Sequence, residues 1–121
     1  MEKLNYRDIV RQTYENKGST TPLNNNELKR YAVALPDHEL IASRFVFSPE
    51  LVEFYHSRLP KVKNASLGTW LNMDNEKIYL DLSLTFDDLE EAVREAYNNN
   101  QIAIYDLKEN QEIRIEIREL D

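Results

Sequence analysis

Residues 77–100 read KIYLDLSLTFDDLEEAVREAYNNN, and the first half of this stretch decides the fold class. From Ile78 to Phe86 every second side chain is large and apolar, which is the period-two pattern of a strand with one face on the core. A register slip of one residue would bury Asp81 and expose five large apolar side chains. We therefore expect a strand here whose pairing register is strongly specified.

A helix is predicted directly after this strand. Residues 87–90, Asp-Asp-Leu-Glu, have the spacing of a capping box with aspartate in the usual place of the hydroxyl residue. The asparagines at 98–100 end the helix, because Asn tolerates the left-handed conformation that a helix C-terminus needs. Helical spacing predicts a buried stripe made of Leu89, Ala92, Val93, Ala96 and Tyr97. The charged residues left facing water are Asp87, Asp88, Glu90, Glu91, Arg94 and Glu95.

Further strands are predicted on both sides of these two elements. Residues 67–71 read as a strand that precedes the one at 78–86, and residues 102–105 are apolar on both faces, which predicts a central strand. The last strand carries outward charges, as an edge strand does. Its inward positions are Ile113, Ile115 and Ile117. Residues 67–121 are therefore expected to form an acidic ββαββ-like module.

The N-terminal half shows weaker patterns. Residues 4–15 have a thin apolar face at helical spacing without a good cap, and residues 16–26 are polar and predict a loop or mobile connection. Residues 30–35 and 40–47 predict the two strands of an antiparallel hairpin. Ser48-Pro49-Glu50 predicts the start of a helix that continues to about Leu59. The shared face of the second strand is expected to hold Ile41, Phe45 and Phe47.

Together these elements predict an α+β fold, in which two or three helices pack on a mainly antiparallel sheet of about six strands. A chain of 121 residues is long enough for one hydrophobic core and too short for two independent ones. We expect a single domain over residues 1–121. Residues 1–26 are expected to contribute an N-terminal helix and a mobile loop.

The composition argues against several classes of function. The chain has no cysteine, which excludes disulfides, thiol catalysis and thiolate metal sites. It has no apolar run of about 18 residues and begins without the apolar stretch of a secretory signal, so a soluble, cytoplasmic protein is expected. Phosphate-binding loops, nucleophile elbows and His-x-x-x-His pairs are not found in it. We therefore expect no cofactor, no metal and no enzymatic activity.

The net charge of −7 is divided unevenly between the two halves of the chain. Residues 1–66 carry ten Lys/Arg and eight Asp/Glu, a balance of +2, whereas residues 67–121 carry five Lys/Arg and fourteen Asp/Glu, a balance of −9. Such an acidic half repels nucleic acid and favours a partner with a basic surface. The alternative is that the charge serves only to keep the protein soluble.

Several residues carry candidate chemistry, and each also has a structural explanation. His38 lies between two carboxylates and is a candidate base or metal ligand, although a solvated turn explains it equally, and His56 is expected on the outer face of its helix. The acids at 87–91 are candidate cation ligands, yet no glycine-containing loop accompanies them and the helix dipole explains their position. Asp81 and Asp106 would share acid/base chemistry only if their strands are neighbours.

One aromatic residue and a small basic cluster complete the candidates. Phe54 falls off the buried stripe of its helix, so it is either a core residue or an exposed anchor for a partner protein. Arg58, Lys61 and Lys63 are too few to form a nucleic-acid footprint.

Residues 67–117 resemble a small domain that occurs in uncharacterised proteins of bacteriophages, plasmids and other mobile elements. The resemblance implies an origin in a mobile element and transfers no catalytic residue to this chain. In size, acidity and lack of cysteine the chain is also similar to inhibitors of host defence, including anti-CRISPR and anti-restriction proteins. The motifs that carry the resemblance are Gly68-x-Trp70, Ile78-Tyr79-Leu80-Asp81-Leu82-Ser83, Asp88-Leu89-Glu90-Glu91-Ala92, Asn99-Asn100-Gln101-Ile102-Ala103-Ile104-Tyr105-Asp106-Leu107 and Glu112-Ile113.

Two functions remain open at this point. The first is a non-enzymatic mobile-element protein that binds a host protein with a basic surface, such as a nucleic-acid-binding protein, and modulates it without contacting nucleic acid or membranes. The second is a structural or assembly protein that forms homo-oligomers. For the first, the expected partner-binding residues are Asp87, Asp88, Glu90, Glu91 and Glu95.

Overall fold

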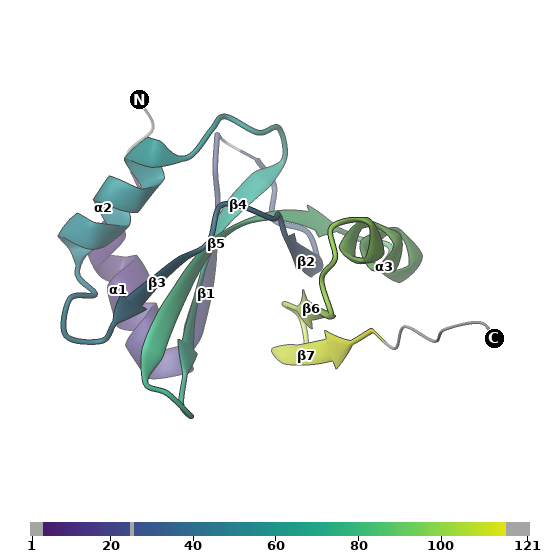
Figure 1. The fold of residues 1–121 in the computed structure, drawn as a ribbon. Helices are drawn as coiled ribbons and strands as arrows, with labels where there is room; N and C mark the ends of the chain where they lie inside the picture. The colour runs from purple at the N-terminus through teal and green to yellow at the C-terminus, as the bar shows by residue number, and fades with distance from the viewer. Residues whose placement is uncertain (1–3, 25, 116–121) are drawn as a thin grey trace.

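The computed structural model of the chain describes residues 4–24 and 26–115. Within these residues the chain forms three helices and one sheet of seven strands, in which every strand pair is antiparallel (Figure 1). This confirms the α+β class. The elements in chain order are α1 (Tyr6–Asn16), β1 (Gly18–Pro22), β2 (Tyr31–Ala34), β3 (Leu40–Ser43), α2 (Pro49–Arg58), β4 (Ala65–Asn72), β5 (Lys77–Phe86), α3 (Leu89–Asn98), β6 (Ala103–Asp106) and β7 (Gln111–Arg114).

The long strand predicted from its alternation is the centre of the sheet. β5 pairs with β4 along one edge, from Lys77 opposite Asn72 to Leu84 opposite Ala65. The strand order is β1-β4-β5-β2-β6-β7, and β3 also pairs with β5. The side chains of β5 that alternate inward at its start, beginning with Ile78, are fully buried. The predicted strand is therefore confirmed, together with the turn that connects it to β4.

The predicted hairpin between residues 30–35 and 40–47 is wrong. β2 and β3 both pair with the same edge of β5, β2 along residues 83–86 and β3 along residues 77–80. β5 is ten residues long and offers enough backbone for both short strands. The connection between them departs from β5 through Asp37, which has a positive φ of 69°. Two strands that follow each other in sequence thus lie end to end instead of side by side.

The second of these strands is shorter than predicted and its inward positions are different. β3 ends at Ser43, whose carbonyl accepts a hydrogen bond from the N–H of Phe47 and closes a turn. Ala42 is buried and Ile41 is 49% exposed, while Phe45 projects from the turn with 91% of its surface exposed. The shared face predicted for Ile41, Phe45 and Phe47 is therefore wrong, because the turn interrupts the alternation and only Phe47 reaches the core.

The loop predicted over residues 16–26 is also wrong for its first half. Residues 18–22 form β1, which pairs with β4 from Gly18 opposite Trp70 to Pro22 opposite Ser66. The strand has no large apolar side chain, so it is held by the backbone hydrogen bonds to β4 and by the 2.6 Å hydrogen bond between the Ser19 and Thr69 hydroxyls. The N-terminal helix is joined to the sheet and is not an appendage.

The predicted ββαββ order of the C-terminal half is observed, but its four strands are not contiguous in the sheet. β2 lies between the two C-terminal strand pairs, with Tyr31 opposite Phe86 of β5 on one edge and opposite Asp106 of β6 on the other. β6 has a neighbour on each edge, as predicted for a central strand, and β7 lies at the edge of the sheet. The predicted inward position Ile117 lies outside the described residues.

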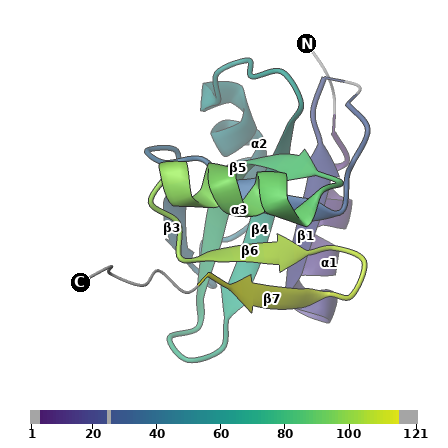
Figure 2. The same cartoon turned by 90° about the vertical axis from the view of Figure 1, so that its right-hand side faces the viewer.

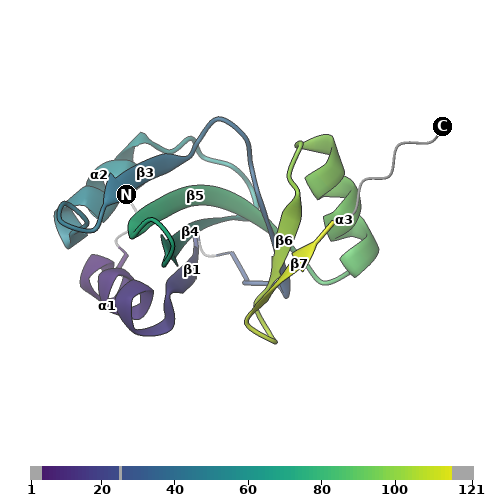
Figure 3. The same ribbon diagram turned by 60° about the horizontal axis from the view of Figure 1, so that its bottom comes forward.

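The three helices cover two separate parts of the sheet. α1 and α2 lie together beside β1, β3 and β4, and α3 lies at the other end beside β2 and β6 (Figures 1 and 3). β6 and β7 run across the direction of β4 and β1, which shows how strongly the sheet twists (Figure 2). The larger core, under α1 and α2, contains Ile9, Leu23, Ala42, Phe47, Val52, Tyr55, Ala65, Leu67, Leu71, Ile78, Leu80 and Leu82. The smaller core, under α3, contains Tyr31, Val33, Ala92, Ala96 and Ile104.

Each helix begins at a side-chain cap. Asn5 caps α1 by accepting the N–H of Asp8, a cap that the sequence did not reveal, and Ser48 caps α2 as predicted by accepting the N–H of Leu51. The cap of α3 is Asp88, one residue later than the predicted capping box places it.

None of the helices among the described residues is long and apolar enough to cross a membrane.

α3 buries a narrower stripe than its spacing predicts. Ala92 and Ala96 are fully buried against β2 and β6, and Val93 is partly buried. Leu89 is 40% exposed and Tyr97 is 59% exposed, so their predicted burial is wrong. The small side chains of the two alanines let the helix approach the sheet closely, which leaves the larger residues at the margin of the contact.

Candidate functional site

The five acidic residues predicted to bind a partner lie on α3 and at its N-terminus. The side chains of Asp87, Asp88, Glu90 and Glu91 are exposed, and Glu95 is half-buried. Asp88 accepts a hydrogen bond from the N–H of Glu90 at 3.1 Å, so its position is partly explained by capping. Among the ion pairs of the described residues, none includes any of these five carboxylates.

These acids surround the first turn of the helix instead of sharing one stripe. Glu91 and Glu95 are four residues apart and lie on one side of α3, whereas Glu90 lies on the side of Arg94 and Tyr97. We call the exposed set Asp87, Asp88, Leu89, Glu90, Glu91 and Tyr97 the α3 surface. It combines four carboxylates without ion-pair partners and two exposed apolar side chains.

The second pair of carboxylates proposed for chemistry is not brought together. Asp106 lies on β6 and Asp81 on β5, and β2 separates the two strands. Asp106 is buried, accepts hydrogen bonds at 3.0 and 2.8 Å from the guanidinium of Arg30, and also accepts the backbone N–H groups of residues 108 and 109. The Arg30 guanidinium holds the pKa of Asp106 below its usual value. Asp106 thus orders the turn after β6 and is not part of an acid/base pair.

Asp81 lies in a different environment, on the sheet face opposite the larger core. Asp81 of β5 is opposite Gly68 of β4, and its carboxylate lies over this glycine. The carboxylate accepts a 2.5 Å hydrogen bond from the hydroxyl of Ser83. A Cβ atom at Gly68 would lie 2.5 Å from Oδ1 of Asp81, so the carboxylate occupies space that only glycine leaves open. Burial raises the pKa of Asp81, the Ser83 hydrogen bond opposes this rise, and the charge of Glu39 adds to it.

A row of large, partly exposed side chains crosses the sheet beside this carboxylate. Ile41 of β3 is opposite Tyr79 of β5, which is opposite Trp70 of β4. The Trp70 and Tyr79 rings are 5.3 Å apart between centroids, and Asn75 donates a 2.8 Å hydrogen bond to the Tyr79 hydroxyl. We call Ile41, Tyr79 and Trp70 the sheet-face row. Sequence reasoning missed it, although aromatic residues at the outward positions of two alternating strands were a visible signal.

The two histidines have structural surroundings. The carbonyl of His38 accepts a hydrogen bond from the Tyr55 hydroxyl, which fixes the connection between β2 and β3 beside α2. His56 is not on the outer face as predicted, because its Nδ1 atom lies 2.8 Å from the Tyr6 hydroxyl between α1 and α2. In the part of the chain that the structure describes, no group of three or more His, Cys, Asp or Glu side chains is arranged to hold a metal ion.

Phe54 is exposed, so the interpretation as a core residue is wrong. The interpretation as an anchor for a partner protein stays a prediction. The guanidinium of Arg58 lies over its ring at 4.8 Å, a cation–π contact along the outer face of α2. Arg58 is therefore already engaged, and Lys61 and Lys63 are exposed in the segment that follows.

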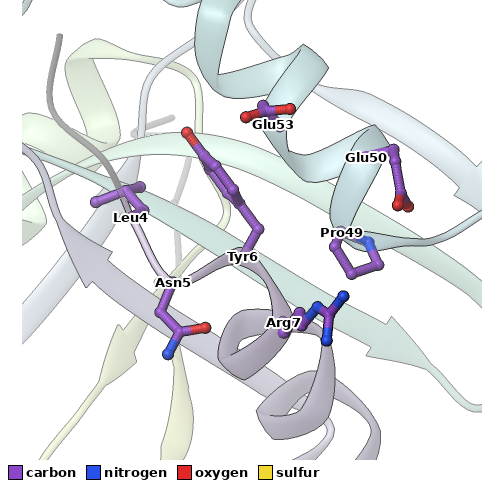
Figure 4. A pocket seen from close by; sticks show the side chains of 7 residues that line it. All are labelled: Leu4, Asn5, Tyr6, Arg7, Pro49, Glu50 and Glu53. Atoms are coloured by element: carbon purple, nitrogen blue, oxygen red, sulfur yellow. The ribbon is translucent and has the colours of Figure 1, made fainter.

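A shallow hollow of about 400 Å³ lies between the N-terminal ends of α1 and α2 (Figure 4). It contains one cationic side chain, Arg7, and two carboxylates, Glu50 and Glu53, together with uncharged side chains.

No protein-family model matches the sequence, and no significant match was found among curated proteins or solved structures.

Proposed function

We propose that this chain is a non-enzymatic binding protein that uses the α3 surface to dock on the basic surface of a partner protein. The observation that carries the proposal is the group of four exposed carboxylates around the start of α3, which have no ion-pair partner in the described chain and share the helix with exposed Leu89 and Tyr97. Charged residues that only serve solubility do not need apolar neighbours. A mixed acidic and apolar surface supplies both long-range attraction and contact area.

The position of these acids on the helix makes them suitable for binding. Carboxylates at a helix N-terminus are stabilised by the positive end of the dipole, so the helix does not require a cation from the same chain to hold them. A partner that presents Lys or Arg side chains gains these carboxylates without breaking an existing ion pair. The expected consequence is fast association that weakens strongly with salt.

The origin and the partner belong to the same proposal. The resemblance of residues 67–117 to a domain of phage and plasmid proteins supports an origin in a mobile element, and the acidic charge supports a host partner that itself binds nucleic acid. The protein would act as an inhibitor of the anti-CRISPR or anti-restriction type by occupying that basic surface. Direct binding of this acidic chain to nucleic acid is disfavoured by its own field.

The test is capture of partner proteins from a bacterial lysate at low and high salt. One variant replaces the five predicted acids with their amides: Asp87→Asn, Asp88→Asn, Glu90→Gln, Glu91→Gln and Glu95→Gln. Asparagine at 88 preserves the helix cap. A control variant makes the same change in net charge at five other exposed acids: Glu27→Gln, Asp37→Asn, Glu50→Gln, Glu53→Gln and Asp74→Asn.

We expect the wild type and the control to capture the same proteins at low salt and the α3 variant to lose them. Capture should also disappear at high salt. If the α3 variant retains its captured proteins while it is folded, the proposed function is wrong.

A second candidate function is assembly into homo-oligomers, and the strand edges favour it. Within the described residues β1, β3 and β7 each pair with a single strand, so each presents an unpaired edge. Sedimentation of the purified protein over a range of concentrations separates the two functions. A stable dimer or larger species supports assembly, whereas a monomer at all concentrations supports partner binding.

A further inference from the structure

The sheet-face row lies on a face that α1 does not cover. On β4, Thr69 faces α1 and its Oγ1 atom is 2.6 Å from that of Thr13, so the adjacent Trp70 points to the other face. Ile41 is 49% exposed and Trp70 is 46% exposed. Ile41 and Trp70 are each directly opposite Tyr79, on its two sides, and about half of each side chain is accessible to water.

The carboxylate of Asp81 is next to this row on the same face. Asp81 follows Tyr79 by two residues on β5, and Gly68 precedes Trp70 by two residues on β4. The Asp81–Gly68 pair therefore lies about 7 Å from the Tyr79–Trp70 pair along the strands. Because Gly68 has no side chain, the carboxylate extends over the backbone of β4 at a position two residues from Trp70. An aromatic pair and an anionic group thus lie within reach of one long side chain.

This carboxylate has no cationic partner in the described parts of the chain. Its hydrogen-bond donor is the neutral hydroxyl of Ser83, and Glu39 adds a second negative charge to its surroundings. Lys77 is on the same face of β5, but it lies four residues away on the far side of Tyr79. Arg44, at the end of β3, forms an ion pair with Glu76. The face therefore offers a carboxyl group without a cationic partner in the described residues, beside aromatic rings.

We propose that this sheet face binds an arginine-containing extended segment of a partner protein, with the guanidinium stacked on the Trp70–Tyr79 pair and paired with the Asp81 carboxylate. Arginine fits better than lysine because its planar group stacks on aromatic rings and binds a carboxylate through two parallel hydrogen bonds. An extended segment fits because it can run along the strands that carry the row. This binding does not depend on the α3 surface.

The single tryptophan of the chain allows a direct measurement. Trp70 is the only Trp, so a change in its emission reports contact at this face. We titrate the protein with a short peptide of alternating arginine and serine, and with matched peptides in which lysine or the uncharged analogue citrulline replaces arginine. The expected result is a saturable change in emission with the arginine peptide, and binding about tenfold weaker or worse with the other two.

Two variants of the site make the test specific, and calorimetric titration measures their affinity. Asp81→Asn should weaken the arginine peptide about tenfold, since it removes the charge from a hydrogen-bonded pair. Trp70→Leu should weaken it as well and keeps an apolar side chain in the row. Thermal unfolding shows that each variant is folded before its affinity is interpreted.

Two further variants serve as matched controls. Asp74→Asn changes the same charge at an exposed residue of the β4–β5 turn and should bind like the wild type. The five-residue α3 variant should also bind like the wild type, so failure of this inference and failure of the proposed function are distinguishable. Equal losses in Asp81→Asn and Asp74→Asn would show unspecific attraction and overturn the inference. So would equal binding of the three peptides, or emission that depends on protein concentration without peptide, because a second copy would then cover the face.

Discussion

Gly68 and Asp81 show how one absent side chain shapes the sheet face opposite the larger core. Gly68 has an ordinary negative φ, so its role is space and not backbone freedom. The Asp81 carboxylate occupies this space and takes its hydrogen bond from Ser83 on its own strand. The face therefore holds a carboxylate low over the sheet, beside side chains that project much further.

Gly68→Ala is expected to lower the free energy of unfolding by about 1–3 kcal/mol, because the new methyl group would overlap the Asp81 carboxylate. Chemical denaturation measures the loss. In an Asp81→Ala background the same substitution should cost clearly less, because the overlapping group is gone. An equal cost in both backgrounds would contradict this explanation.

Asp81 also makes a specific contribution to the pH dependence of stability. Burial raises its pKa above the usual 3.8, so the folded protein holds the proton more tightly than the unfolded chain. The free energy of unfolding therefore decreases as pH rises from 3.8 through the raised pKa. Asp81→Asn should be more stable than the wild type at neutral pH, and the difference should vanish in acid.

Asp106→Asn provides the opposite case for the same experiment. The pKa of Asp106 lies below 3.8, so its stabilising effect is complete above that pH and is lost as pH falls further. The variant should be less stable than the wild type at neutral pH, and the gap should close below 3.8. Denaturation curves over a range of pH measure both variants. Parallel curves for wild type and Asp81→Asn would contradict the assignment for Asp81.

At the scale of elements, α3 depends on two small residues for its contact with the sheet. Ala92 and Ala96 are fully buried against Val33 and Ile104, and larger side chains have no room there. The apolar residues that flank them, Leu89 and Tyr97, are left to the surface.

Ala96→Leu is expected to lower the free energy of unfolding by about 1–3 kcal/mol through overpacking. Arg94→Leu introduces the same side chain on the exposed side of the same helix and should change stability by no more than about 0.5 kcal/mol. Thermal or chemical unfolding of the two variants makes the comparison. Equal effects would mean that the helix is not held by a close contact at residue 96.

The elements that the sequence predicted well are those whose pattern is local. The strict alternation of residues 78–86 led to β5, and the acids and asparagines at the two ends of α3 led to that helix. The predicted N-terminal cap of α3 was wrong by one residue, because Asp87 and Asp88 are adjacent and both are suitable caps. The exposure of Asp87, Asp88, Glu90 and Glu91 was likewise predictable from helical spacing.

The elements that the sequence predicted poorly are defined by contacts far along the chain. β1 has no apolar pattern and exists because β4 offers a free edge to residues 18–22. β2 and β3 look like a hairpin in sequence, but the longer β5 pairs with both. The outward aromatic residues were visible in the sequence, but the row that Tyr79 and Trp70 form with Ile41 depends on the registers of three strands.

At the scale of the whole molecule, the position of β2 joins the two halves of the chain. β2 separates β5 from β6, and without it the C-terminal elements have no continuous sheet. The smaller core also takes Tyr31 and Val33 from this strand. The acidic half is therefore a distinct segment of the sequence, but it is not a separate unit of the structure.

A fragment of residues 64–121 is expected not to fold on its own. It contains β4, β5, α3, β6 and β7, yet it leaves the edge of β5 unpaired and removes β2 from the core under α3. Circular dichroism and the dispersion of amide signals in NMR compare the fragment with the whole chain. A cooperative melt and a well-dispersed spectrum from the fragment would contradict the structural account.

The pairing of β1, β2 and β3 has a consequence for synthesis. Each of these strands finds its partner only in β4, β5 or β6, which all lie after residue 64. A nascent chain that has left the ribosome as far as α2 therefore contains three strands and not a single strand pair. The sheet can assemble only after β5 has emerged, through contacts of high sequence separation that slow folding. Newly made protein is thus exposed to aggregation and to chaperones for longer than its small size suggests.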